Sequence, residues 1–183
     1  AAAVATAMRH IELTDATATV LGGTGPVGRR AAQMLAAAGA TVRLVSRSID
    51  RATDACETIA AITNGHLIPV VAFNSNQIAD AAEGAQLIIA SGAAGVEFVD
   101  RNVIEDLASL RVAIDLNAVP PAGIGGIEVH DKAAKIGRVV TYGAIGVGGL
   151  KMKTHRIAVA RLFETNEAVL DAAEIFSIAR SIG

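Results

Sequence analysis

The feature that most constrains this chain is a glycine-rich turn that joins an apolar run to an alanine-rich segment. The apolar run covers residues 17–21, and Gly23, Gly25 and Gly28 follow it at the G-x-G-x-x-G spacing. Between a strand and a helix, such glycines allow a tight turn, a close approach of the backbone to a pyrophosphate, and close packing of helix on strand. The amides that open the helix favour a bound anion. The sequence therefore predicts a phosphate-binding loop at Gly23, Thr24, Gly25, Pro26, Val27 and Gly28.

Apolar runs alternate with helix-like segments along most of the chain. Further strands are predicted at residues 41–46, 67–73, 85–90, 111–117 and 139–142. Later helices are predicted over residues 48–64, 77–83, 100–108 and 145–163, and again from residue 171. Near-continuous apolar strands that alternate with helices are typical of a parallel sheet covered on both faces. The sequence therefore predicts the α/β class, with a doubly wound parallel sheet of the Rossmann type.

In a doubly wound sheet, the ligand lies in a crevice outside the carboxyl ends of the strands. Stretches rich in glycine, serine or proline follow five of the predicted strands, at residues 23–28, 46–48, 91–95, 117–126 and 143–149. Because the carboxyl ends of parallel strands lie at one edge of the sheet, we expect these five stretches to meet in a single crevice.

The end of the second predicted strand bears on the identity of the ligand. A site selective for NAD usually places Asp or Glu about twenty residues beyond the glycines, where it binds the ribose 2′-hydroxyl. This chain has Ser46, Arg47 and Ser48 there, with Arg51 one helical turn further on. A guanidinium group can hold a 2′-phosphate through paired hydrogen bonds, and hydroxyls can add further ones. The sequence therefore favours NADP as the cofactor; an exposed arginine with no ligand is the alternative.

Composition limits the classes of protein to which the chain can belong. With 183 residues, 52% of them hydrophobic, it is long enough for one full core and too short for two ordinary domains. The net charge of -2 gives no electrostatic reason to expect nucleic acid or an acidic membrane as a partner. No uninterrupted apolar segment reaches the roughly 18 residues of a membrane span. We therefore expect a soluble protein.

The cysteine and the histidines give no sign of a metal or a nucleophile. Cys56 is the only cysteine, which excludes an internal disulfide, fits a reducing compartment, and predicts a small core residue. His10, His66, His130 and His155 show neither metal-ligand spacing nor a catalytic triad. The sequence therefore predicts a cytoplasmic protein without a bound metal.

The two ends of the chain indicate its domain organisation. Residues 1–8 are helix-like, yet no capping residue precedes them and the basic start of a signal peptide is absent. We interpret residues 1–13 as a helix that links to an N-terminal domain absent from the sequence, and residues 14–163 as the Rossmann-type NADP-binding domain. Residues 164–183 are predicted to form a C-terminal helix, with a capping box at Asp171, that packs back toward the missing domain. The alanine-rich ends also favour a homo-oligomer.

Three segments together resemble one enzyme family: residues 21–28, 115–127 and 143–156. The first segment is common to many dehydrogenases, whereas the second and third are far more specific, and the likeness covers almost the whole chain. The family that the chain resembles is the NADP-dependent methylene-tetrahydromethanopterin dehydrogenases of one-carbon metabolism. The resemblance implies a preceding domain of roughly a hundred residues, a typical domain size, that supplies much of the pterin site.

The resemblance implies hydride transfer from the methylene carbon that bridges two pterin nitrogens to the nicotinamide of NADP. Because no proton leaves the reacting carbon, which becomes a methenyl cation, the site needs positioning rather than a general base. It also implies the cofactor contacts: the pyrophosphate at Gly25, Pro26 and Val27, the 2′-phosphate at Arg47 and Ser48, and the ribose and nicotinamide at Ser91, Gly92, Ala93 and Asn117.

Lys151 corresponds to a lysine that lies beside the pterin in that family, which makes it the candidate residue of the catalytic site. A cation beside a carbon that becomes positive opposes the reaction by Coulomb repulsion. We therefore expect Lys151 to grip or orient the pterin. A solvated lysine near a helix start is the alternative.

Other functions remain open at this point. A methylenetetrahydrofolate dehydrogenase has the same nucleotide-binding domain and differs in its pterin contacts. A reductase of the shikimate dehydrogenase kind needs a lysine–aspartate pair from the missing domain. A non-enzymatic module that senses NADP needs no second domain.

Overall fold

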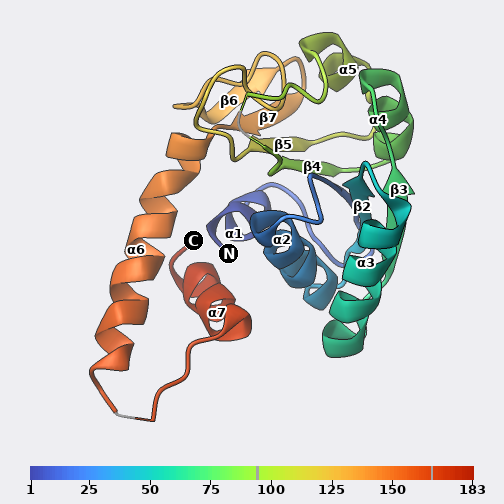
Figure 1. The fold of residues 1–183 in the computed structure, drawn as a ribbon. Coiled ribbons are helices and arrows are strands. Elements are labelled where there is room, and N and C mark those ends of the chain that lie inside the picture. The colour runs from blue at the N-terminus through green and yellow to red at the C-terminus, as the bar shows by residue number, and fades with distance from the viewer. Residues whose placement is uncertain (94, 166) are drawn as a thin grey trace.

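The sheet is the centre of the fold. The computed structural model describes residues 1–93, 95–165 and 167–183, and in them seven strands form one sheet with helices on both faces (Figure 1). The strands are β1 (Thr17–Leu21), β2 (Thr41–Ser46), β3 (Leu67–Val71), β4 (Leu87–Ala90), β5 (Val112–Asp115), β6 (Lys132–Ile136) and β7 (Val139–Tyr142). They lie in the order β3-β2-β1-β4-β5-β7-β6. The predicted doubly wound α/β fold is confirmed.

The strand order creates the crevice in which such folds bind ligands. Strand β1 pairs in parallel with β2 on one side and with β4 on the other, with Leu21 opposite both Val45 and Ala90. The chain leaves β1 in one direction and later crosses to β4 in the other, so the connections after these two strands diverge. A crevice opens at this switch point, outside the carboxyl ends of the strands.

Helices cover the two faces of the sheet, and each face has its own apolar core. On one face lie α1 (Ala2–Ala7), α2 (Pro26–Ala37), α3 (Ile49–Thr63) and α7 (Ala172–Ile182). On the other lie α4 (Ser75–Ala82) and α5 (Arg101–Asp106). Successive strand residues point to opposite faces, so Val20 and Leu44 join the first core, whereas Leu21 and Val45 join the second. The long helix α6 (Ala144–Leu162) packs beside α1 and α7 (Figure 1).

Several helix boundaries follow the local chemistry that the sequence predicts. The Ser48 hydroxyl accepts a hydrogen bond from the Arg51 backbone N–H and caps α3, and α3 ends at Asn64 in the left-handed region with φ 52°. The capping box between Asp171 and Glu174 opens α7. Helix α4 begins at Ser75, two residues before the prediction, because Asn74 caps it through the Gln77 N–H.

One edge strand of the sheet was not predicted from the sequence. Strand β6 runs antiparallel to β7, with an irregularity between Lys132 and Ala134. Its residues are mostly exposed and only Ile136 is buried, so β6 lacks the continuous apolar run by which the other strands were recognised. At the opposite edge, Pro69 lies inside β3, where the missing N–H is tolerated because an edge strand has one unpaired side.

The terminal segments belong to the same body as the sheet. All six residues of α1 are buried, and Leu13 joins the same apolar core. Helix α7 packs against α1, α2 and α6. The division into a linking segment 1–13, a nucleotide-binding domain 14–163 and a C-terminal segment 164–183 stays a prediction. Among the described helices, none combines the length and apolar character that crossing a membrane requires.

Candidate cofactor-binding site

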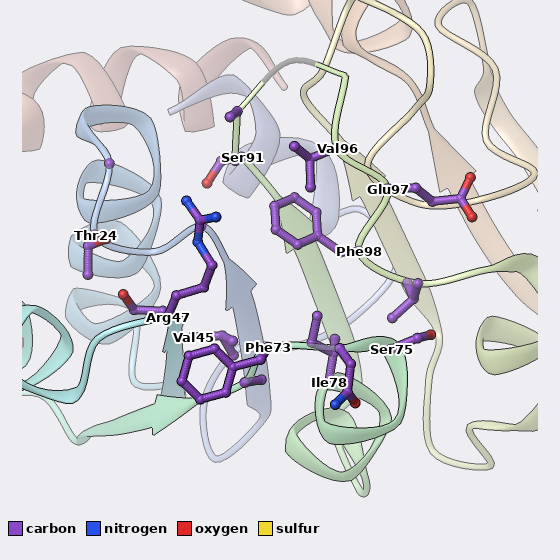
Figure 2. Close-up of a pocket in the computed structure, with 18 of the residues that line it drawn as sticks. Thr24, Val45, Arg47, Phe73, Ser75, Ile78, Ser91, Val96, Glu97 and Phe98 are labelled. Atoms are coloured by element: carbon purple, nitrogen blue, oxygen red, sulfur yellow. The ribbon is translucent and has the colours of Figure 1, made fainter.

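A cavity of about 590 Å³ lies at the carboxyl ends of β1 to β4, at the switch point of the sheet (Figure 2). It brings together nine of the predicted site residues: Thr24, Gly25, Pro26, Ser46, Arg47, Arg51, Ser91, Gly92 and Ala93. The other predicted residues do not line it: Gly23, Val27, Gly28, Ser48, Asn117 and Lys151.

The glycine-rich turn is packed too closely to hold larger side chains. Gly22, which sequence reasoning missed, has φ 68°, and a methyl group on it would lie 2.5 Å from the Gly92 Cα. A methyl group on Gly23 would lie 2.5 Å from Leu44 Cγ, and one on Gly28 would lie 2.6 Å from the Gly22 carbonyl oxygen. Gly23 and Gly28 therefore bring the helix against the sheet rather than line the cavity.

The start of α2 lies at the cavity, which Gly25 and Pro26 line. Gly25 is the N-cap and offers no side-chain cap, and Pro26 occupies the first turn. The first amides of a helix have no partner within the helix, and the helix dipole makes this end favourable for an anion. The turn thus has the arrangement that binds phosphate in dinucleotide folds.

The end of β2 presents cations and hydroxyl donors. Ser46 Oγ accepts from the Ser48 N–H at 3.2 Å, and Ser48 Oγ accepts from the Arg51 N–H at 3.4 Å. Both hydroxyls act as acceptors in these bonds, so their own protons remain available to a ligand. Ser46 faces the cavity, whereas Ser48 lies outside its lining.

The two arginines of this strand end line the cavity and are exposed. Figure 2 shows the Arg47 guanidinium pointing into the cavity, toward Ser91 and Phe98. Within the described residues, neither Arg47 nor Arg51 makes a side-chain hydrogen bond or ion pair. By contrast, Arg29 on α2 pairs with Asp54 at 2.7 Å. Arg47 and Arg51 are therefore the cations that remain available to an anionic ligand.

The end of β4 lies beside the glycine-rich turn. Ser91 Oγ donates to the Leu21 carbonyl oxygen at 3.0 Å, which ties β4 to the end of β1. Gly92 and Ala93 continue along the cavity wall. Ala94, within the predicted stretch 91–95, lies outside the described residues.

The far wall of the cavity was missed by sequence reasoning. It consists of residues after β3 and after β4: Phe73, Asn74, Ser75 and Ile78, and Val96, Glu97, Phe98, Val99 and Asp100. These stretches have no glycine motif, and only the rule that ligands lie at the carboxyl ends of strands pointed to the end of β3. Ser75 Oγ is buried and has no hydrogen-bond partner among the described residues.

The loop after β5 is organised by a buried carboxylate. Asp115 is 1% exposed; Oδ1 accepts from the Asn117 N–H at 2.9 Å and Oδ2 from the Ile124 N–H at 3.0 Å. Burial raises the pKa of Asp115, and the backbone N–H groups oppose that rise. Asn117 is 7% exposed, and its Nδ2 has no hydrogen-bond partner among the described residues. The residues after β5 and β7 thus lie beyond the cavity, contrary to the expectation of a single crevice lined by all five stretches.

Lys151 lies in the second turn of α6 and is exposed. The start of this helix is fixed against the loop before β6. Gly143 and Gly146 lie so close to the backbone at Glu128 and Asp131 that a methyl group on either would overlap it. Lys151 makes no ion pair or side-chain hydrogen bond within the described part of the chain.

Cys56 and His10 have structural surroundings. Burial, with a smaller effect of Glu57, raises the pKa of the Cys56 thiol to about 11, as expected of a core residue. His10 Nε2 lies 2.8 Å from the Tyr142 hydroxyl. Across the described ranges, no group of three or more His, Cys, Asp or Glu residues is arranged to hold a metal ion.

Comparison with known proteins places these features in a family. The sequence profile of the family described as "Putative NAD(P)-binding" matches residues 10–123. The "Bifunctional protein MdtA" of Methylorubrum extorquens is 39% identical over 144 residues, which are 79% of this chain and 50% of MdtA. The "NAD(P)-dependent methylenetetrahydromethanopterin dehydrogenase" of the same organism is 37% identical over 101 residues, which are 54% of this chain and 34% of that protein. The chain thus spans half or less of these relatives.

Two solved structures share the fold. The ligand-free 5-ketofructose reductase of Gluconobacter sp. strain CHM43 has a TM-score of 0.61 at 17% identity, covering 100% of this chain and 62% of that one. An L-alanine dehydrogenase has a TM-score of 0.54 at 21% identity, covering 81% and 44%. At these identities the likeness concerns the fold alone. Because the family profile matches residues 10–123 and the glycine-rich turn is present, the chain belongs to the family described as "Putative NAD(P)-binding".

Proposed function

We propose that this chain is the NADP-binding part of an oxidoreductase that oxidises methylene-tetrahydromethanopterin, or methylene-tetrahydrofolate, to its methenyl form. The observation that supports NADP as the cofactor is the pair Arg47 and Arg51. Both line the cavity where an NAD site places a carboxylate, and neither forms an ion pair within the described residues. The assignment of a pterin substrate rests on the resemblance of the later segments and on the name of a relative that is 37% identical over part of the chain.

The residues present fit a 2′-phosphorylated dinucleotide. The amides at the start of α2 suit the pyrophosphate, and the close packing of Gly22 on Gly92 leaves bare backbone for it to approach. The arginines and the free hydroxyl proton of Ser46 suit the 2′-phosphate. Asn117 follows β5, which lies on the opposite side of β1 from β2 and Arg47, and the family resemblance supports a contact of this residue with the ribose or nicotinamide.

When bound, NADP supplies a nicotinamide ring that accepts a hydride. The part left to this chain is binding and orientation, because oxidation of a methylene carbon between two nitrogens releases no proton that a base must remove. Lys151, on the helix that follows β7, is proposed to hold the pterin. Its charge suits a polar or anionic group of the pterin better than the reacting carbon.

The remaining part of the cleft is proposed to come from another domain. MdtA is about twice as long as the matched region, so in such a protein a second domain has room to cover the crevice. A homo-oligomer in the cytoplasm is part of the same proposal. Placement of reacting atoms about 3 to 3.5 Å apart is worth several kcal/mol of barrier, so half a cleft is expected to give little turnover.

The test compares binding with turnover. By calorimetry, residues 1–183 are expected to bind NADP more tightly than NAD. Negligible oxidation of either methylene pterin is expected from them alone, with activity restored in a protein that also carries the N-terminal domain. Turnover of roughly 1 per second or more by the isolated chain contradicts the domain account.

Different results contradict the proposed pterin substrate and the proposed cofactor. If the longer protein binds NADP yet oxidises neither methylene-tetrahydromethanopterin nor methylene-tetrahydrofolate, the pterin assignment is wrong. A reductase of the shikimate dehydrogenase kind or an NADP-sensing module then takes its place. If no NADP binds, the cofactor assignment itself is wrong.

A further inference from the structure

The cavity has an apolar side next to the two free arginines. Val45 comes from the end of β2, Phe73 and Ile78 from the segment after β3, and Phe98 from the segment after β4. In NADP the 2′-phosphate and the base sit on neighbouring carbons of one ribose. A 2′-phosphate held by Arg47 and Arg51 therefore places the base within one sugar of these arginines, against this apolar side.

Phe98 is the ring best placed to meet that base. Figure 2 shows the Phe98 ring and the Val96 side chain pointing into the space that the Arg47 guanidinium enters, whereas Glu97 points the opposite way. Phe98 is half-buried, while Phe73 is 65% exposed. The inner ring is thus Phe98, and Phe73 lies at the more open side.

The backbone around Phe98 is held in place from outside the cavity. The Phe98 N–H donates to the Gly123 carbonyl oxygen at 2.8 Å, and the Gly125 N–H donates to the Val99 carbonyl oxygen at 2.8 Å. Both bonds tie the segment to the loop after β5. The backbone that carries the ring is therefore held in place before a ligand binds. This lowers the entropy lost when the ring is ordered against a ligand.

The other side of the ring is fixed by a glycine. Gly92 has no side chain, and a methyl group there would overlap the tip of the Phe98 ring. The ring thus lies over the bare backbone of Gly92, which in turn packs on Gly22 of the phosphate-binding turn. This contact sets the ring at a defined height above the floor of the cavity.

We propose that Phe98 is the base-stacking residue of the cofactor site, an affinity-determining side chain that stacks on the purine while Arg47 and Arg51 hold the 2′-phosphate. The inference rests on the proposed NADP binding and adds to it the residue that recognises the base. Stacking of a base on an aromatic ring is favourable because the flat faces match and both leave water.

The experiment measures the binding of NADP, 2′,5′-ADP and inorganic pyrophosphate to the parent protein and its variants by calorimetry. Phe98→Ala is expected to weaken NADP and 2′,5′-ADP by about 5- to 100-fold. Pyrophosphate, which has no base, is expected to keep its affinity. Phe98→Tyr is expected to restore nucleotide binding, and Phe98→Leu, which keeps apolar volume without an aromatic face, only in part.

Two controls separate the inference from damage to the fold. Phe163→Ala removes an 86% exposed ring after α6, far along the chain from the cavity, and is expected to change nothing. Phe73→Ala is expected to cost less than Phe98→Ala. Full nucleotide affinity in Phe98→Ala or Phe98→Leu, or a loss confined to Phe73→Ala, overturns the assignment of Phe98. A parent protein that binds neither NADP nor 2′,5′-ADP overturns the proposed function, and the inference with it.

Discussion

Gly22 and Gly92 meet backbone to backbone at the floor of the cavity, where a methyl group on Gly22 would lie 2.5 Å from the Gly92 Cα. Gly22 also has φ 68°, which a residue with a Cβ adopts at a cost. Gly22→Ala is therefore expected to lower the free energy of unfolding by about 2–4 kcal/mol and to weaken NADP binding. Urea unfolding and calorimetry measure the two effects.

Gly84 provides the matched control, because it has φ 73° and no atoms within 4 Å of an added methyl group. Gly84→Ala carries the conformational cost alone, about 1–2 kcal/mol, and leaves cofactor binding intact. Equal losses of stability in the two variants contradict the role given to the contact with Gly92.

Arg47→Ala tests the cofactor preference. Removal of a guanidinium that binds the 2′-phosphate is expected to cost about 1.5–3 kcal/mol of NADP binding, the value of a hydrogen bond to a charged group, and to leave NAD binding nearly unchanged. Calorimetric titration with both cofactors measures the difference. Arg156→Ala, an exposed arginine on α6, serves as the control for a general loss of positive charge. The same loss for NADP and NAD contradicts the assignment.

Lys151→Ala tests the proposed pterin contact in a protein that carries the N-terminal domain. Pterin turnover is expected to fall strongly, with NADP affinity within a factor of a few of the parent, because Lys151 lies outside the cofactor cavity. Lys153 is two residues away on the same helix and is also exposed, which makes Lys153→Ala the matched control. If the Lys151→Ala enzyme turns over at the parental rate, Lys151 does not contact the pterin and is an ordinary solvated lysine.

The raised pKa of Asp115 predicts a specific dependence of the free energy of unfolding on pH. Its pKa is raised by burial, so the native state keeps this proton to higher pH than the unfolded state does. Native protein then binds more protons than unfolded protein, and the contribution to the free energy of unfolding falls as pH rises from about 4 through the raised pKa. Asp115→Asn lacks this titration and, because one amide nitrogen then faces a backbone N–H, is less stable by a constant amount.

The measurement is the difference in unfolding free energy between the parent and Asp115→Asn, by urea titration from pH 3.5 to 7. The parent's advantage is expected to shrink with rising pH and then to level off. A difference that stays constant across the range contradicts the raised pKa of Asp115.

Local chemistry explains what the sequence predicted well. The glycine-rich turn, the Ser48 cap and the capping box at Asp171 depend on a few neighbouring residues, so they can be recognised from short patterns. The buried strands β4 and β5 are apolar along most of their length, because both faces of a doubly wound sheet are covered.

Long-range packing explains what the sequence analysis missed. Strand β6 is mostly exposed and exists through its pairing with β7, so its own residues show no strand pattern. Phe73 and Phe98 look like ordinary core residues until the fold places them on one cavity with Arg47. Gly28 has the close helix packing that the spacing predicts, because a methyl group on it would overlap the Gly22 carbonyl oxygen, and one on Gly23 would overlap Leu44 of β2.

The two borders of the sheet bear on self-association. An unpaired strand edge is a template on which another chain can add a strand, and proline and lysine at such edges oppose this. Here β3 carries Pro69, which has no N–H to donate, and β6 carries the exposed cations Lys132 and Lys135. Both borders thus disfavour amyloid-like stacking and continuous intermolecular sheets.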